Sequence, residues 1–135
     1  MTFEAALVAE LSAVPELAGK IFPLSANGAP APYLVYVSSN GLSAKGLDGY
    51  GTGKDVAVEL NIMTSTYSEL KMITASVLAI LHTFEKRQLG TDGPFIQELT
   101  QQEPAEMYEP LPKLNRCSIR FNVYFKEELS WQIEQ

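Results

Sequence analysis

The sequence is poor in cysteine, histidine and basic residues, and each shortage excludes a class of protein. Cys117 is the only cysteine and His82 is the only histidine, so the chain cannot form an internal disulfide or a zinc site of Cys and His ligands. Ten basic residues against sixteen acidic ones give a net charge of −6, which disfavours binding to nucleic acid. We therefore expect a fold held together by its hydrophobic core alone, with no metal and no cofactor.

A long apolar run and a secretory leader are also missing. No stretch is long enough to cross a bilayer, and Met1 precedes an acidic amphipathic segment with no basic or apolar leader region. We therefore expect synthesis in the cytoplasm and no contact with a membrane. The 135 residues, of which 46% are hydrophobic, suffice for one core, so we expect a single domain over 1–135 with 127–135 as a C-terminal tail.

Apolar residues at helical spacing predict two helices. The first follows Thr2, a plausible N-cap, and ends near Pro15. The second begins at Thr66, which forms a capping box with Glu69. Its inward stripe consists of Leu70, Ile73, Val77, Leu81 and Phe84.

Alternating apolar and polar residues predict the strands. The clearest lie at 33–38, 55–64 and 116–126, with a further candidate at 95–100 and a brief one at 20–22. A stretch with five glycines, residues 40–54, joins two of them as a long hairpin loop, and 101–112 is a polar loop with three prolines. We expect an α+β fold in which two helices pack on one face of a mainly antiparallel sheet of four to five strands.

The sequence contains no competent set of catalytic residues. His82 falls away from the apolar stripe of its helix, and Cys117 lies on the apolar face of the last strand. The segment from Gly41 to Lys54 lacks the spacing of a phosphate-binding loop and runs into a strand. Glu106 and Glu109 read as a solvated acidic patch in a loop. We therefore predict that the protein is not an enzyme.

Two surfaces fit assembly better than isolation. The outer side of the second helix carries Met72, Ala75 and Ala79, a more apolar surface than a free helix face needs. The tail places Leu129, Trp131 and Ile133 two residues apart, a ribbon that typically marks an interface or an added strand. Two alternatives are equally compatible with these patterns: loops of the same chain cover the helix, and the tail folds back locally.

The order of motifs along nearly the whole chain resembles the tail-completion family of long-tailed bacteriophages and prophages, which includes tail terminators and head–tail joining proteins. The motifs are Pro32-Tyr33-Leu34-Val35-Tyr36, Leu47-Asp48-Gly49, the alternating strand Val56 to Ile62, Thr66-Tyr67-Ser68-Glu69, and the aromatic-rich strand Arg116 to Phe125. The acidic stretch 103–109 and the tail 127–135 have no place in the family pattern.

This resemblance implies a virion protein, made in the bacterial host cytoplasm, that closes into a ring at the head-proximal end of the tail tube. Such a ring, commonly a hexamer, stops tube growth and joins the tail to the head. Its partners are its own copies, the tail tube protein and a head–tail connector protein, while DNA passes through the lumen without specific binding. The contact residues that we predict are Leu42, Lys45, Leu47, Tyr50, Lys54, Met72, Ala75, Ala79 and Trp131.

Two other interpretations compete with the terminator. The chain could be a different head–tail connector or minor tail subunit. It could also be a small cytosolic module that binds a ligand or a peptide on the exposed face of its sheet, in which case a deep pocket in the monomer would be expected.

Overall fold

The structure, a computed structural model, describes residues 1–46 and 49–126, with the backbone alone at 42–46 and 49–52. Two α-helices, one 3-10 helix and eight strands lie in these residues. In chain order they are α1 (Phe3–Leu11), η1 (Pro15–Leu17), β1 (Ile21–Pro23), β2 (Tyr33–Ser38), β3 (Leu42–Gly46), β4 (Gly49–Thr64), α2 (Tyr67–Leu81), β5 (Arg87–Gln88), β6 (Phe95–Gln101), β7 (Ala105–Glu109) and β8 (Leu114–Lys126).

The sheet is built around two long strands, β4 and β8. They form one antiparallel ladder from Gly53 opposite Lys126 to Thr64 opposite Asn115. The described strands follow the order β1-β2-β4-β8-β6-β5, while β3 continues beside β4 and β7 continues beside β8. Only β1 and β2 pair in parallel among these strands, so the sheet is mixed. Each long strand therefore has two shorter strands in line along its outer side.

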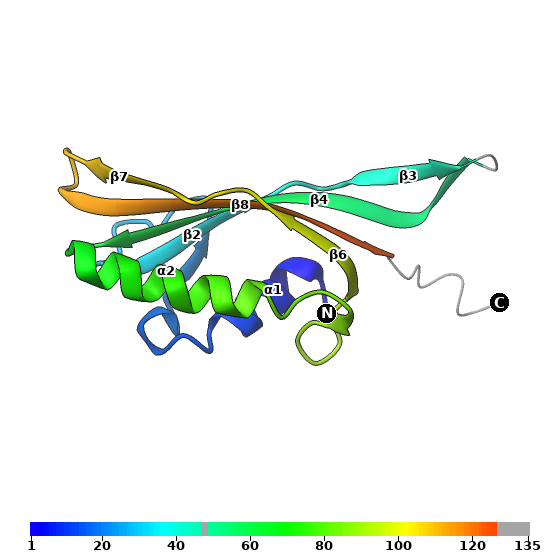
Figure 1. Ribbon diagram of the computed structural model, residues 1–135, viewed down its shortest axis with the longest axis horizontal. Coiled ribbons are helices and arrows are strands. Elements are labelled where there is room, and N and C mark those ends of the chain that lie inside the picture. Colours follow the sequence, from blue (N-terminus) through cyan, green and yellow to red (C-terminus); the bar gives the residue numbers. More distant parts are fainter. Residues whose placement is uncertain (47–48, 127–135) are drawn as a thin grey trace.

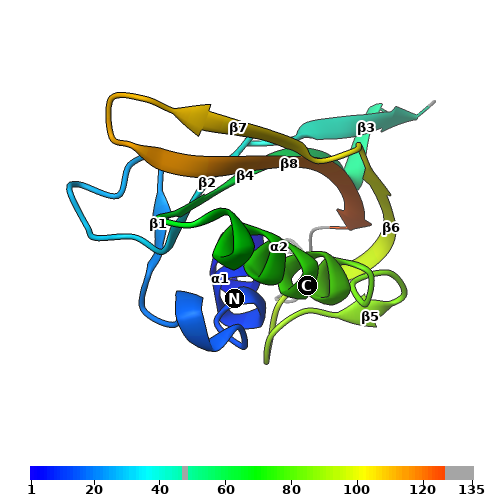
Figure 2. The ribbon, with the colours of Figure 1, turned by 60° about the vertical axis from the view of Figure 1, so that its left-hand side comes forward.

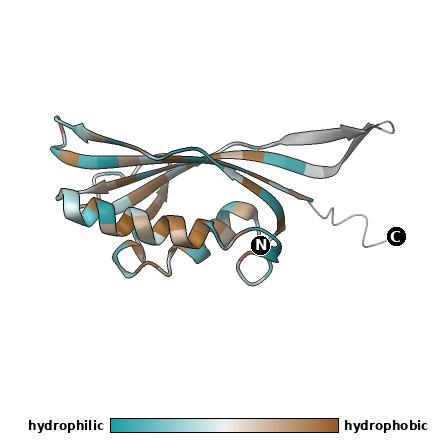
Figure 3. Ribbon diagram, in the orientation of Figure 1, coloured by the Kyte–Doolittle hydropathy of each residue, from teal (hydrophilic) through white to brown (hydrophobic). Residues whose placement is uncertain are grey.

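Both helices cover one face of this sheet (Figures 1 and 2). The hydroxyl of Thr66 accepts the N–H of Glu69 at 3.3 Å and so caps α2 as predicted. The buried stripe of α2 faces the apolar residues of β4 and β8, and hydrophobic positions alternate along the strands (Figure 3). The α+β class with two helices on one face is thus confirmed. None of the described helices has the length and apolar character needed to cross a membrane.

The sheet is larger than the sequence patterns indicated. The segment 101–112 was expected to be a loop, but residues 105–109 form β7 and pair with β8. Four of these five residues are exposed, so β7 has no buried face and no apolar alternation to reveal it. Likewise, much of the glycine-rich stretch 40–54 is strand, since β3 pairs with β4 from Leu42 opposite Asp55 to Gly46 opposite Gly49.

The two ends of the sheet differ in how far they extend relative to the helices (Figure 1). At one end the backbone of the β3–β4 hairpin projects well beyond α1 and α2, and at the other end β7 and β8 form a second hairpin above the start of α2 (Figure 1). Tyr124 of β8 lies over Gly53 at the base of the first hairpin, because a Cβ atom at Gly53 would come within 2.3 Å of the tyrosine Oη. Glycine at this position makes room for the ring.

Candidate assembly surface

The candidate nucleophile Cys117 and the candidate base His82 lie on different elements and at different places. His82 caps the end of α2, where its Nε2 lies 3.2 Å from Oε1 of Gln101, a residue that pairs with Phe121. Cys117 is buried and pairs with Ile62, four residues along β8 from Phe121. Burial also raises the pKa of the Cys117 thiol, which disfavours the reactive thiolate.

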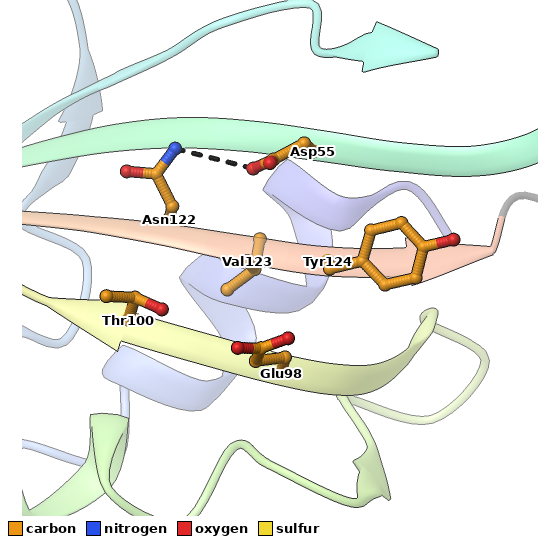
Figure 4. A pocket seen from close by; sticks show the side chains of 6 residues that line it. All are labelled: Asp55, Glu98, Thr100, Asn122, Val123 and Tyr124. Carbon is orange, nitrogen blue, oxygen red and sulfur yellow. Dashed lines mark hydrogen bonds between the residues drawn. The ribbon is translucent and has the colours of Figure 1, made fainter. Parts of the chain in front are cut away.

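The end of the glycine-rich segment does not have the geometry of a phosphate-binding loop. Gly53 and Lys54 lie inside β4, where no helix begins. A small polar hollow of about 110 Å³ lies between β4, β6 and β8. It places Asp55 beside Asn122, whose Nδ2 donates to the Asp55 carboxylate at 3.4 Å, with Glu98 on β6 (Figure 4). No group of three or more potential metal ligands occurs in the described part of the chain.

The face of the sheet opposite the helices is polar and carries a network of charged side chains. Arg116 donates to Asn61 Oδ1 and to Glu109 Oε1, each at 2.9 Å. Arg120 donates from Nε to Glu59 Oε1, also at 2.9 Å. Hydrogen bonds from Asn61 and Arg120, together with the nearby arginine charges, lower the pKa of Glu59. This open face is therefore ordered by its own ion pairs.

A larger hollow of about 360 Å³ interrupts the open face where β2, β4 and β8 lie side by side. Val37, Glu59 and Arg120 form one row across these strands. Val37 is 42% exposed and gives this row an apolar member beside the two charged ones. The lining residues are Val37, Ser39, Ala57, Val58, Glu59, Gln102, Arg120, Phe121 and Asn122.

The predicted contact residues of the glycine-rich segment gather on the β3–β4 hairpin. Leu42 pairs with Asp55, and Lys45 pairs with Tyr50. Lys54 lies in β4 between Ser43 and Phe125. Leu47 lies outside the described residues. The hairpin therefore brings four of these five positions onto one projecting element, and their role in contacts remains a prediction.

The other predicted contacts lie on a separate surface. Met72, Ala75 and Ala79 occupy the outer side of α2 and are exposed, with Met72 at 52%. The described residues do not cover this side of the helix, which argues against the alternative that loops of the same chain do so. Trp131 lies outside the described residues.

The acidic residues Glu106 and Glu109 lie on strand β7 and not in the loop that the sequence predicts. Glu106 is bound by Lys71, with Nζ 2.8 Å from Oε2, and lies 3.4 Å from the Tyr67 hydroxyl. Its hydrogen bond raises the pKa of Lys71 to about 12. Glu109 is bound by Arg116. Both carboxylates of β7 are thus paired, Glu106 with α2 and Glu109 with β8, and these pairs depend on a strand that the sequence pattern does not reveal.

The open-face ion pairs were missed for a different reason. Glu59 and Arg120 are 61 positions apart in the sequence, so only the register of β4 and β8 brings them together. A signal was present, because Glu59 and Asn61 alternate on one predicted strand as Arg116 and Arg120 do on another. Only the strand order, which places β4 beside β8, shows that these two sets of side chains meet.

Comparisons with known proteins agree with the fold. A chain of a solved structure described as the virion of a native gene transfer agent (GTA) particle matches with a TM-score of 0.64 and 12% identity, over 92% of this chain and 94% of that chain. Another solved chain matches with a TM-score of 0.56 and 14% identity, over 94% of this chain and 92% of that chain. Among curated proteins, none matches. At such low identity the two structures show a shared fold only.

The family comparison goes further. The model of the family described as tail completion protein gp17 matches residues 5–126, which include every described helix and strand except the first residues of α1. The protein therefore belongs to the tail completion protein gp17 family and is a structural protein of a phage-like tail.

Proposed function

We propose that copies of this protein form a ring at the head-proximal end of the tail tube, where the ring stops tube growth and joins the tail to the head. The observation that carries the proposal is the β3–β4 hairpin, which projects beyond the helix-covered part of the sheet (Figure 1). Membership of the tail completion family supports a place in the tail. The resemblance of the sequence to tail terminators implies a hexamer.

The hairpin suits contact with a neighbour for a physical reason. Within the described residues β3 pairs only with β4, so the outer edge of β3 carries backbone N–H and C=O groups without a strand partner. An exposed edge of this kind is a template for pairing with another chain. A neighbouring copy or the tube protein would cover the edge and satisfy these groups.

Charge and surface shape fit the same role. A net charge of −6 suits a ring whose lumen lets DNA pass without binding it. The two hollows described above are open on the sheet face, whereas a small-molecule site encloses most of its ligand. They therefore argue against the competing module only where its ligand is a small molecule, and they leave the face open to contact with a protein or peptide.

Solution mass and electron microscopy test the proposal. Sedimentation of the purified protein across a range of concentrations should reveal a single large species, and negative-stain images should show closed rings. If rings form only on a tail, added tail tubes should carry extra density at one end. A protein that stays monomeric and leaves tube ends bare would contradict the proposal.

A deletion tests the hairpin itself. Removing residues 46–51 should leave the ladder from Gly53 to Thr64 intact, so the melting temperature should stay close to that of the wild type. Ring formation should be lost. The matched control is Leu24→Ser in the β1–β2 connection, a position that is 76% exposed; this variant should assemble normally. Normal rings from the deletion variant would exclude the hairpin as the contact.

A further inference from the structure

The larger hollow of the open face combines an apolar lining with spare hydrogen-bond donors. Its lining includes Ala57 and the exposed Val37. The side chain of Arg120 is 65% exposed and donates from Nε to Glu59. Its two terminal nitrogens have no partner among the described residues. The hollow can therefore accept an apolar side chain that has a carboxylate next to it.

Arg120 is the arginine of this face that is available to a partner. The neighbouring Arg116 already donates to Asn61 and Glu109 and lies within 3.9 Å of Glu59, and its side chain is only 30% exposed. A second protein that docks on the open face would therefore find its specific polar contact at Arg120, beside Val37.

The sequence of this protein contains a segment with the matching chemistry. Residues 127–135, which lie outside the described residues, read EELSWQIEQ. They carry three glutamates and no basic residue. In an extended conformation Leu129, Trp131 and Ile133 would share one side. An indole ring stacks well on a guanidinium group, so Trp131 could contact Val37 and Arg120 together while a glutamate approaches the free nitrogens.

Chain length bears on which copy supplies this segment. Arg120 lies six residues before Lys126 on β8, which is about 20 Å along a strand. Trp131 lies five residues after Lys126, and a chain reversal uses about two of those residues. The remaining three residues span only about 10 Å. After the reversal the main chain therefore ends about 10 Å short of Arg120, a gap that only the two long side chains could bridge, so chain length favours a second copy as the donor of the segment.

We propose that the segment 127–135 of a second copy docks in the hollow, with Trp131 against Val37 and Arg120. The inference rests on the proposed assembly of copies and adds a contact to it. Donor segment and acceptor hollow are different surfaces, so the contact is heterologous. Contacts of this type generate a closed ring when the rotation between copies closes, which agrees with the proposed function.

Trp131 is the only tryptophan, so its fluorescence reports directly on docking. The acceptor is the full-length chain with Trp131→Ala, which contains no tryptophan, and the probe is a synthetic peptide of residues 126–135. Adding acceptor should shift the peptide emission to shorter wavelength in a saturable way. Acceptors that also carry Val37→Asp or Arg120→Glu should bind the peptide about tenfold more weakly or worse, because a charge then meets the indole or repels the glutamates.

The control acceptor carries Leu111→Asp, an equally drastic change at a position that is 96% exposed at the far end of β8; it should bind like the parent. Circular dichroism establishes that each acceptor is folded. Peptide emission that stays unchanged, or that shifts equally with the Val37→Asp acceptor, would overturn the inference. So would blue-shifted emission from dilute monomeric wild type, since the segment would then dock on its own chain.

Sedimentation of the wild-type protein separates this inference from the proposed ring. Rings without peptide binding would overturn the docking contact and leave the proposed function standing. Peptide binding without rings or tube-end density would support the docking contact and remove the terminator role.

Discussion

Glu10 links helix α1 to the turn after β5, and its replacement tests how much one partly buried ion pair stabilises this fold. The carboxylate accepts hydrogen bonds from both terminal nitrogens of Arg87, with N···O distances of 2.7 and 3.1 Å. It also accepts a hydrogen bond of 2.8 Å from the backbone N–H of Gly90. Its side chain is 18% exposed. Residues 77 and 80 positions away in the sequence are thus held to α1 by one side chain.

The change Glu10→Gln removes the charge and replaces one acceptor oxygen with a donor. Hydrogen bonds to a charged group contribute about 1.5–3 kcal/mol. The lower end applies here, because Arg87 is 37% exposed and also donates to the Thr83 carbonyl at 2.8 Å, so it keeps a partner. We expect a loss of about 1.5 kcal/mol in the free energy of unfolding, or about 5 °C in melting temperature for a domain of this size.

The pH dependence supplies a second test of the same contact. The hydrogen bond from Arg87 is the main cause that lowers the pKa of Glu10 in the folded protein. Its stabilising contribution is therefore complete above the unfolded value of about 4.3 and is lost as the pH falls through the lower folded value. The gap in melting temperature between wild type and Glu10→Gln should be full at neutral pH and shrink in acid.

Thermal melts followed by circular dichroism, from neutral pH into acid, measure this gap. The matched control is Glu16→Gln in η1, a glutamate with no partner among the described residues; it should melt like the wild type. Equal melting temperatures for wild type and Glu10→Gln at neutral pH would refute the reasoning. A gap that persists undiminished in acid would show that the charge is not its cause.

Three further predictions concern other sites. Lys71→Ala should leave the melting temperature almost unchanged, because the Lys71–Glu106 pair is exposed, at 54% and 29%. The thiol of Cys117, whose pKa burial raises, should react far more slowly with a thiol reagent in the native protein than in denaturant. Gly90→Ala should lower the free energy of unfolding by about 1 kcal/mol or more in a denaturant titration, since φ is +59° there and a Cβ would lie 2.6 Å from Met1 Sδ.

The sequence predicted best the elements that have one buried face. Along β8, residues from Cys117 to Phe125 alternate because every second side chain enters the core. The stripe of α2 from Leu70 to Leu81 is buried for the same reason. In both cases local spacing carries the information, so the pattern alone located these elements and the face on which they pack.

Elements without a buried face could not be found in this way. In β7, Met107 is 43% and Tyr108 is 56% exposed, and only pairing with β8 defines the strand. The parallel pairing of β1 with β2 likewise depends on where the intervening chain returns. The hollow beside Val37 is still harder to predict, because it arises where three strands and Gln102 meet. The apolar spacing of the tail could be seen in the sequence, whereas the hollow could be seen only in the structure.

The chemistry of the hollow predicts which forces hold a docked segment there. A single exposed charge contact at Arg120 contributes at most about 1 kcal/mol, whereas burying a tryptophan against Val37 contributes about 2 kcal/mol or more. Removing the charge with Arg120→Ala, or raising the ionic strength, should therefore weaken peptide binding by less than tenfold. Val37→Asp should weaken it more. If salt abolished binding while Val37→Asp had no effect, the contact would be electrostatic and would have to lie outside the hollow.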